Sequence, residues 1–230
     1  MCGRYRSPTT LDSMRALLQF LNELPEDIRP RYNAAPTDSL PVVRLDRNGN
    51  RELAMLRWGL VPFWAKDAKV GAKFINARAE TIATAPAFRT AFRTRRCLVP
   101  AGGFYEWKKA HGRRQPYHIG MRDGTPFAFA GLWERWNGGA ALIESFTIIT
   151  GEPNSLVADL HDRMPAILDP EDYDTWLRAA DTAIAAAMLQ QPFPAQLMAA
   201  YPVSTNVNSV KNDAPDLIEP IALNDDDRLI

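Results

Sequence analysis

Short apolar runs separated by turn signals fill much of the chain, and this pattern constrains the fold more than any other feature. Residues 40–45 and 52–56 are strand-like and flank Asn48-Gly49. An Asn-Gly pair between two apolar runs is a strong signal for a β-hairpin. A longer series of strand-like runs covers residues 97–134, with turn signals at Gly102-Gly103, His111-Gly112 and Asp123-Gly124. We expect this second region to form an antiparallel meander.

Helical patterns lie on either side of these strands. The spacing of apolar residues predicts a helix over 11–21 that Pro25 ends. The other expected elements are helices over 81–92, interrupted near Pro86, over 154–161, over 171–180 and through the alanine-rich stretch 183–189, and strands over 146–150 and 203–207. Together they predict an α+β fold with one domain over residues 1–230, in which a mixed, largely antiparallel sheet curls into a barrel surrounded by helices. An acidic tail is expected over about 212–230.

The composition excludes several classes of protein. Cys2 and Cys97 are the only cysteines, too few for a disulfide framework or a structural zinc site, and we expect neither metal nor cofactor. Cys97 opens an apolar run and is expected to be a buried, unreactive thiol. The stretch 183–189 is far too short to span a bilayer, and no apolar run follows the first arginines as a signal peptide would require. We therefore expect a cytoplasmic protein, and we expect it to be a monomer. Its 230 residues suffice for a self-sufficient core without disulfides or metal.

The charge is balanced overall but unevenly distributed. The chain has 27 basic and 27 acidic residues, yet fourteen Lys or Arg and only three acids fall between Arg57 and Arg122. Such asymmetry gives a neutral protein a local positive field, the footprint expected for a polyanion such as DNA or RNA. Clustered charge on a solvated surface explains the same pattern as often, so it favours nucleic acid only weakly.

The chain begins Met1-Cys2, and this position gives the cysteine a chemistry that no internal cysteine has. Removal of Met1, which is usual before a small side chain, leaves an α-amine and a thiol on adjacent carbons of Cys2. The amine condenses with an aldehyde to a Schiff base, and the thiol then closes a five-membered thiazolidine ring. The ordinary pKa of the amine is about 7.7–8.0, so part of it is free to attack near neutral pH. Taken alone, an incidental cysteine on a frayed terminus fits equally well.

Six short motifs hold polar or aromatic residues that a bare core would not need. In chain order they are Cys2-Gly3-Arg4-Tyr5, Arg31-Tyr32-Asn33-Ala34-Ala35-Pro36, Trp58-Gly59-Leu60-Val61-Pro62, Asn76-Ala77-Arg78-Ala79-Glu80-Thr81, Gly103-Phe104-Tyr105-Glu106-Trp107 and His161-Asp162-Arg163-Met164-Pro165. In this order the chain resembles the SRAP family of abasic-site processing proteins over residues 2–208. The resemblance implies a sensor that captures an abasic site in single-stranded DNA as a covalent crosslink through the N-terminal cysteine.

The resemblance implies catalytic roles for four side chains. Cys2 supplies both amine and thiol. Glu106, between two aromatic residues, is expected to have a raised pKa and to move protons during ring closure. His161 is expected to assist opening of the sugar ring or hold its freed hydroxyl, and Asn76 to orient the amine or the sugar. Each has a plainer interpretation, with Glu106 a solvated acid, His161 a residue near a helix C-terminus and Asn76 a helix cap or turn residue.

Single-stranded DNA with an abasic site is the implied partner. Motif arginines suit phosphate oxygens, and the candidates are Arg4, Arg78 and Arg163. The side chain of Asn33 is expected to touch the nucleic-acid backbone as well. Trp64, beside Phe63, is expected to be exposed and to stack on bases, whereas Trp58 is expected in the core.

Two other classes of function stay open. An N-terminal nucleophile amidohydrolase, such as a glutaminase domain, also begins Met-Cys-Gly and uses the α-amine as base for the thiol. Those domains carry an Asn-Gly-x-x-x-Asn motif, whereas Asn48-Gly49 here sits in a hairpin turn. A noncovalent single-strand binder would suit the arginine-rich, tryptophan-bearing middle of the chain. The family resemblance also implies a self-processing peptidase, in which Glu106 activates water, and β-elimination at the abasic site.

Overall fold

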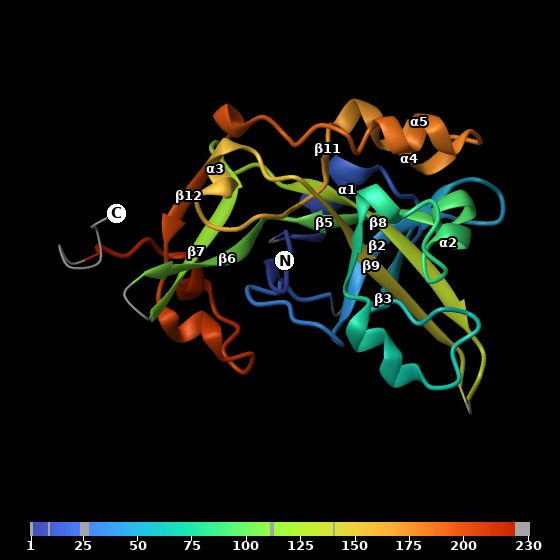
Figure 1. Cartoon of the computed structure of the whole chain (residues 1–230), viewed down its shortest axis with the longest axis horizontal. Helices are drawn as coiled ribbons and strands as arrows, with labels where there is room; N and C mark the ends of the chain where they lie inside the picture. The colour runs from blue at the N-terminus through green and yellow to red at the C-terminus, as the bar shows by residue number, and fades with distance from the viewer. Residues whose placement is uncertain (1, 9, 24–27, 111–112, 140, 224–230) are drawn as a thin grey trace.

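Five strands close into a mixed barrel in the computed structural model, which describes residues 2–8, 10–23, 28–110, 113–139 and 141–223 (Figure 1). The barrel strands are β2 (Ser39–Leu45), β3 (Arg51–Trp58), β5 (Arg96–Ala101), β8 (Phe127–Trp136) and β9 (Ile143–Gly151). Their order is β9-β3-β2-β5-β8, and pairing of β8 with β9 closes the ring. Neighbours are antiparallel except β3 and β9, which run parallel. The predicted α+β fold with a curled sheet is confirmed.

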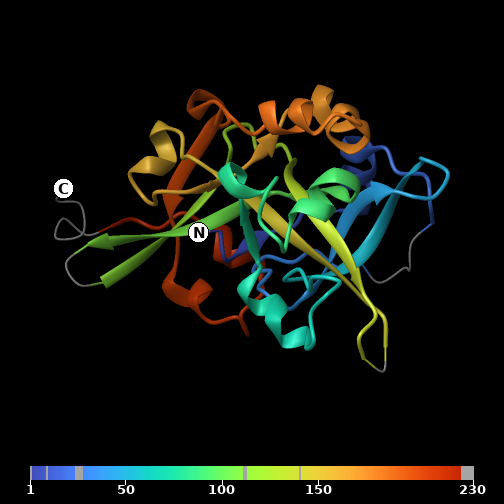
Figure 2. The same ribbon diagram turned by 45° about the vertical axis from the view of Figure 1, so that its right-hand side comes forward.

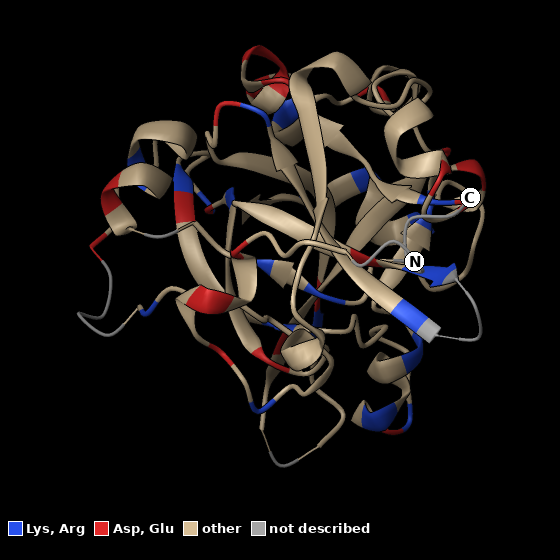
Figure 3. Cartoon of the chain, turned by 90° about the vertical axis from the view of Figure 1, so that its left-hand side faces the viewer, with Lys and Arg blue, Asp and Glu red and all other residues tan. Residues whose placement is uncertain are grey.

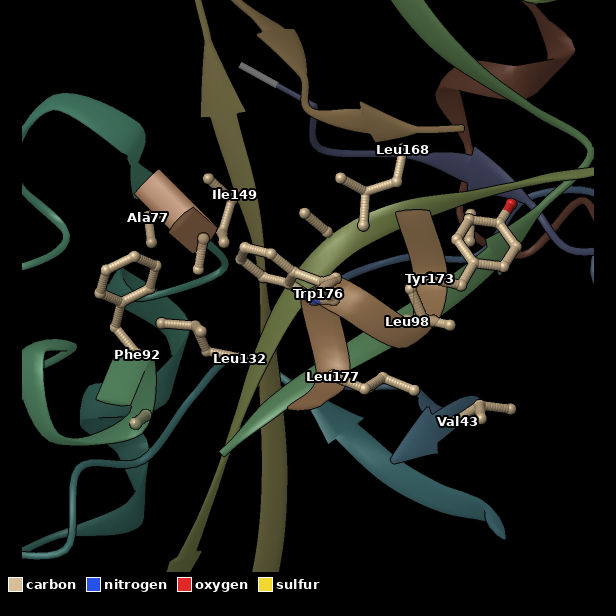
Figure 4. Packing of buried hydrophobic residues seen from close by; sticks show 14 of the residues in the cluster. Val43, Ala77, Phe92, Leu98, Leu132, Ile149, Leu168, Tyr173, Trp176 and Leu177 are labelled. Carbon is tan, nitrogen blue, oxygen red and sulfur yellow. The ribbon is translucent and has the colours of Figure 1, made fainter. Parts of the chain in front are cut away.

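Successive side chains of the barrel strands face opposite sides and build two cores. Val42 and Ile148 join one apolar cluster, whereas their neighbours Val43 and Ile149 join another that lies under the helices. Trp176 packs against this second set of strand residues (Figure 4). The helices that contribute to it are α1 (Leu11–Leu18), α2 (Arg89–Thr94), α4 (Tyr173–Arg178) and α5 (Thr182–Ala187). The helices therefore cover the outer face of the barrel and leave the ends of its strands for other contacts.

A second, four-stranded antiparallel sheet lies beside the barrel. Its order is β1 (Tyr5–Arg6), β6 (Gly103–Ala110), β7 (Arg113–Met121) and β12 (Met198–Pro202). The hairpin of β6 and β7 extends beyond the body of the molecule (Figures 1 and 2). Three short strands extend the barrel sheet. β4 (Asn76–Arg78) runs parallel beside β9, β10 (Met164–Pro165) pairs with β9, and β11 (Ile167–Leu168) pairs with β8. The short helix α3 (Ser155–Ala158) follows β9.

The hairpin predicted around Asn48-Gly49 is confirmed by the pairing of β2 with β3. The single meander predicted over residues 97–134 is wrong, because β5 pairs with β2 and β8 whereas β6 pairs with β1 and β7. The chain leaves the barrel at Gly102-Gly103, where a Cβ on Gly103 would lie 2.2 Å from Nε2 of His118. The two glycines thus mark a change of sheet instead of a hairpin turn. The turn predicted at His111-Gly112 lies outside the described residues.

Two predicted helices differ from the observed ones. The helix expected over 81–92 is replaced by a 3-10 turn at Ala79–Thr81 and by α2, which begins only after Pro86 because proline lacks the N–H that a continuous helix needs. The first helix ends at Leu18, where Gln19 takes a left-handed conformation with φ 53° and its N–H caps the last turn. The proline expected to end that helix lies outside the described residues.

The segment after β12 packs back on the second sheet. Residues 203–207 are not the predicted strand, since β12 ends before them and Thr205–Asn208 is a 3-10 helix. Leu217 is buried in a small cluster with Tyr105, and Val203 forms an isolated β-bridge with Pro220. The last acidic run of the sequence lies outside the described residues. None of the described helices has the length and apolar character needed to cross a membrane.

Candidate active site

The N-terminal segment is held as an edge strand beside β6. Tyr5 lies opposite Phe104, and the N–H of Tyr105 donates to the carbonyl of Arg4 at 3.1 Å. In an antiparallel pair the two residue numbers have a constant sum, so the same register places Gly3 opposite Glu106. The fold thereby brings the beginning of the chain to the carboxylate that the sequence singled out.

Cys2 is fully buried and held by an amide. Nδ2 of Asn76 donates to the carbonyl oxygen of Cys2 at 2.8 Å. Asn76 reaches this position because β4 pairs with Ile148 of β9, at the edge of the barrel. Its Oδ1 is buried and accepts no hydrogen bond from the described part of the chain, so it is available to an added donor. Burial, and next the charge of Glu106, raise the pKa of the Cys2 thiol well above its ordinary value, which keeps the thiol protonated near neutral pH.

Glu106 is a buried carboxylate with a pKa near neutrality. It is 3% exposed, and burial raises its pKa to about 7, with the carboxylate of Asp162 adding to the rise. The predicted desolvation of this side chain is therefore confirmed, and the solvated-acid interpretation is wrong. A carboxyl group with this pKa exists in both forms near pH 7 and is able to give or take a proton.

His161 lies in the turn that follows α3. Its Nδ1 accepts a hydrogen bond from the N–H of Arg163 at 3.0 Å, and the carboxylate of Asp162 lies 2.9 Å from the same nitrogen. Burial lowers the pKa of His161, and the charge of Asp162 partly offsets this shift. Asp162 affects the pKa of both His161 and Glu106, which places this turn near the carboxylate.

Arg163 forms an ion pair that the sequence did not reveal. Its guanidinium donates twice to the carboxylate of Glu80, at 2.5 and 2.9 Å, and also to the carbonyl of Thr150. The side chain of Arg163 is only 15% exposed, and this contact lowers the pKa of Glu80. Glu80 lies in the same motif as Asn76, and this was the only feature of the sequence that pointed to a role for Glu80 at the site. The pair ties the His161 turn to the segment that follows β4, and any phosphate that Arg163 contacts has to share it with Glu80.

Asn33 and Arg4 meet inside the protein. Asn33 is fully buried, and its Nδ2 lies within 3.1 Å of three backbone carbonyl oxygens in residues 207–212. Its Oδ1 accepts from Arg4, whose guanidinium also donates to the carbonyls of Val207 and Asn208. The structure therefore makes Asn33 an anchor for this loop, with its amide occupied by protein groups. Its contact with nucleic acid stays a prediction. Arg4 is half-buried and keeps part of its guanidinium at the surface.

The aromatic residues divide as predicted. Trp58 is fully buried, whereas Trp64 is 49% and Phe63 57% exposed. The exposed pair is held in place, since Nε1 of Trp64 donates to the carbonyl of Pro86 and Nε1 of Trp136 to that of Ala65. This loop presents two rigid rings to solvent. Arg78, which follows Asn76 on β4, is exposed as well.

The fold and the site together define an α+β barrel protein whose N-terminal segment places a cysteine beside an amide and near a buried carboxylate. The family model described as SOS response associated peptidase (SRAP) matches residues 1–210. The chain belongs to the SRAP family, as its six motifs suggested.

Named relatives agree with this assignment. Abasic site processing protein YoqW of Bacillus subtilis is 44% identical over 223 residues, covering 95% of this chain and 99% of the relative. Abasic site processing protein YedK of Escherichia coli is 32% identical over 227 residues, covering 96% and 100%. A crystal structure of a protein from Bacteroides thetaiotaomicron superposes with a TM-score of 0.86 at 26% identity, covering 96% of this chain and all of that one.

Proposed function

We propose that this protein, once Met1 is removed, captures abasic sites in single-stranded DNA as a covalent thiazolidine crosslink through Cys2. The observation that carries the proposal is the placement of the buried Cys2 beside the Asn76 amide and near the buried Glu106 carboxylate. Membership in a family of abasic site processing proteins supplies the substrate class. The chemistry requires neither metal nor cofactor, and one monomer contains every group that it uses.

The proposed reaction joins one carbon of the sugar to two atoms of Cys2. The open form of an abasic deoxyribose exposes an aldehyde. The Cys2 amine adds to the aldehyde carbon, and loss of water gives a Schiff base. The thiol sulfur then adds to the same carbon, the carbon–nitrogen double bond becomes single, and the proton of the thiol ends on the nitrogen. The ring therefore forms with one molecule of water as the only by-product. The amine acts first because the buried thiol is protonated.

The neighbouring side chains would move protons and hold the sugar. Glu106 in its acid form protonates the departing hydroxyl, and as carboxylate it takes the proton of the thiol. Oδ1 of Asn76 accepts from the amine or from a sugar hydroxyl. His161, in the turn after α3, would hold the hydroxyl that ring opening frees. The strand itself would lie across Arg78, with a base stacked on Trp64.

Incubation with a single-stranded oligonucleotide that contains one abasic site tests the proposal. We expect a band shift that survives denaturing electrophoresis, and an intact mass that shows Met1 removed. The variant Cys2→Ser should lose the durable band, because a hydroxyl closes the ring less favourably than a thiol. Its amine still forms a Schiff base, so borohydride should trap part of the protein. A Schiff base acidifies the adjacent carbon, so some strand cleavage by β-elimination is expected as well.

The matched control is Cys97→Ala, which removes the other buried cysteine of the barrel core. It should crosslink like the parent. A Cys2→Ser band as durable as that of the parent would contradict ring closure by sulfur. A parent protein that binds the oligonucleotide but gives no denaturant-resistant band would point to the noncovalent binder. Release of ammonia from an amide substrate would point to the amidohydrolase.

A further inference from the structure

The hairpin of β6 and β7 carries an arrangement of charge that does not help the fold. Lys109 on β6 lies directly opposite Arg114 on β7, and both side chains are exposed. Lys108 precedes Lys109 on the same strand. Like charges directly opposite one another destabilise an antiparallel pair. The basic ends of the two strands flank the tip of the hairpin (Figure 3).

The base of this hairpin is braced, so the charges sit on a fixed support. Nε1 of Trp107 donates to Oδ1 of Asn208 at 2.7 Å on one side. On the other side, Nε2 of Gln115 donates to the carbonyl of Val203 at 2.8 Å. Beyond these contacts the ribbon consists of β6 and β7 alone. A hairpin that is already rigid loses less conformational entropy when a charged ligand binds to it.

The hairpin also has a defined distance from the candidate site. Lys109 lies three residues after Glu106 on the same strand, about 10 Å along it at about 3.3 Å per residue. The odd separation turns its side chain to the opposite face of the strand, which Tyr105 and Trp107 share. A nucleic-acid strand advances about 3.4 Å per nucleotide in a duplex and further when extended. About 10 Å of strand therefore corresponds to about one to three nucleotides between the reacting sugar and the level of Lys109 on the hairpin.

We propose that Lys109 and Arg114 bind the phosphate backbone on one side of the abasic site, one to three nucleotides from the captured sugar. The inference rests on the proposed function. It assigns the DNA on one side of the abasic site to the hairpin of β6 and β7. The ligand is a polyanion because the two cations face each other without an intervening acid and point away from the apolar core. Arg47 offers the comparison, since it is an exposed arginine beside the turn of the other hairpin, between β2 and β3.

The test uses single strands that carry a reduced abasic site, which cannot crosslink, extended on one side, on the other side or on both. Binding is measured by fluorescence anisotropy at several salt concentrations for the parent, Lys109→Glu, Arg114→Glu and the control Arg47→Glu. We expect each hairpin variant to weaken binding about three- to tenfold for one extension only. The slope of log affinity against log salt should fall by about 0.7 for each phosphate of the single strand that the variant no longer neutralises. Lys109→Gln, which removes the charge without reversing it, should show the same preference with a smaller effect.

Equal binding by the hairpin variants and Arg47→Glu on all three strands would overturn the assignment. An equal loss of affinity for both one-sided extensions would also overturn it, because that result would indicate a general electrostatic effect instead of a local phosphate site. Thermal melting of each variant checks that the exposed substitutions leave the fold intact. Failure of the proposed function would be seen separately, as a parent protein that does not crosslink unreduced abasic DNA, whatever the anisotropy shows.

Discussion

At the residue scale, two buried acids share one environment. Burial raises the pKa of the Cys2 thiol and of the Glu106 carboxyl, and the charge of Glu106 raises that of the thiol further. This is the opposite of the positive surroundings that activate a nucleophilic cysteine. The arrangement instead suits a reaction in which the amine attacks first and the sulfur adds later, with a carboxylate close by to take its proton.

Glu106→Gln should slow crosslinking by about 10²-fold, because the amide keeps the shape and loses the proton transfer. The measurement is the single-turnover crosslinking rate at saturating protein between pH 5 and 9. With a pKa of about 7, the parent should show a change of slope near pH 7 that the variant lacks. An equal rate for parent and variant at every pH would make this carboxylate structural.

The raised pKa of Glu106 also predicts a change of stability with pH. Between about 4.5 and 7 the folded protein keeps a proton that the unfolded chain has lost, so the free energy of unfolding falls as pH rises. Its full span is up to about 3 kcal/mol, at 1.36 kcal/mol per pKa unit. Relative to the parent, Glu106→Gln should therefore be more stable at pH 7.5 than at pH 4.5. Urea titrations at both values measure this, and a constant difference between parent and variant would contradict the assigned pKa.

The sequence predicted the polar centre of the site better than its support. Cys2, Asn76 and Glu106 meet because each lies in a motif of unusual polarity, and the aromatic neighbours of Glu106 signalled its desolvation. The roles of Asn33 and Glu80 were not predictable in this way. Their partners are the backbone of residues 207–212 and the guanidinium of Arg163, which only the folded chain brings near.

At the scale of elements, the exposed aromatic loop depends on a close approach of two backbones. Gly59 has φ 120°, and a Cβ on it would lie 2.7 Å from the carbonyl oxygen of Gly71. The chain therefore folds back after β3 and enters the 3-10 helix Ala68–Lys73. Trp64 lies in the loop between these two closely packed backbones, so its ring is held at the surface away from the barrel core.

Trp64→Ala and Arg78→Ala should weaken DNA binding in different ways. Loss of a stacking ring costs about 1–3 kcal/mol per base and leaves the salt dependence nearly unchanged. Loss of Arg78 should reduce the slope of log affinity against log salt by about 0.7. Anisotropy at two or more salt concentrations separates the two effects, with Trp58 unsuitable as a control because it is buried. A reduced slope for Trp64→Ala, or tighter binding of the parent to intact duplex than to single strands, would contradict this path for the DNA.

Local signals predicted elements better than their partners. An Asn-Gly turn fixes the pairing of its own two strands, so β2 and β3 were predictable. The turn at Gly102-Gly103 looks the same in sequence but carries the chain from one sheet to another, because β1 arrives from the distant N-terminus to pair with β6. Pairing over about a hundred residues leaves no local pattern. Neither does the parallel pairing of β3 with β9 inside the barrel.

At the scale of the whole molecule, the basic middle of the sequence is not one surface. Arg96 is buried and donates to backbone carbonyls that include those of Phe92, Trp176 and Ala179. These carbonyls lie at the ends of α2 and α4, where a cation is favourable. Arg95 pairs with the buried Glu134. Part of the charge that suggested a polyanion therefore holds helices in place, and exposed cations such as Arg78 and Lys109 are left to face solvent.

The segment around Asp213 packs on the loop that supports the N-terminal strand. The carboxylate of Asp213 accepts from the N–H groups of Tyr32 and Asn33, at 2.6 and 2.9 Å, and pairs with Arg31 at 2.5 Å. The next residue along, Ala34, exchanges two backbone hydrogen bonds with Tyr5 of β1. The C-terminal segment is thereby linked, through residues 31–34, to the strand that carries Cys2.

Asp213→Asn should therefore affect both stability and chemistry. The amide loses the ion pair and weakens two charge-assisted hydrogen bonds, so we expect a loss of about 1–3 kcal/mol in the free energy of unfolding. Loosening residues 31–34 removes support from β1, so crosslinking at saturating DNA should slow as well. Asp216→Asn is the matched control, an exposed acid of the same segment with the same change of charge. Urea titration and single-turnover crosslinking measure the two effects. If Asp213→Asn matched Asp216→Asn in both, the C-terminal segment would not support the N-terminal strand, and Cys2 would be held by β6 and Asn76 alone.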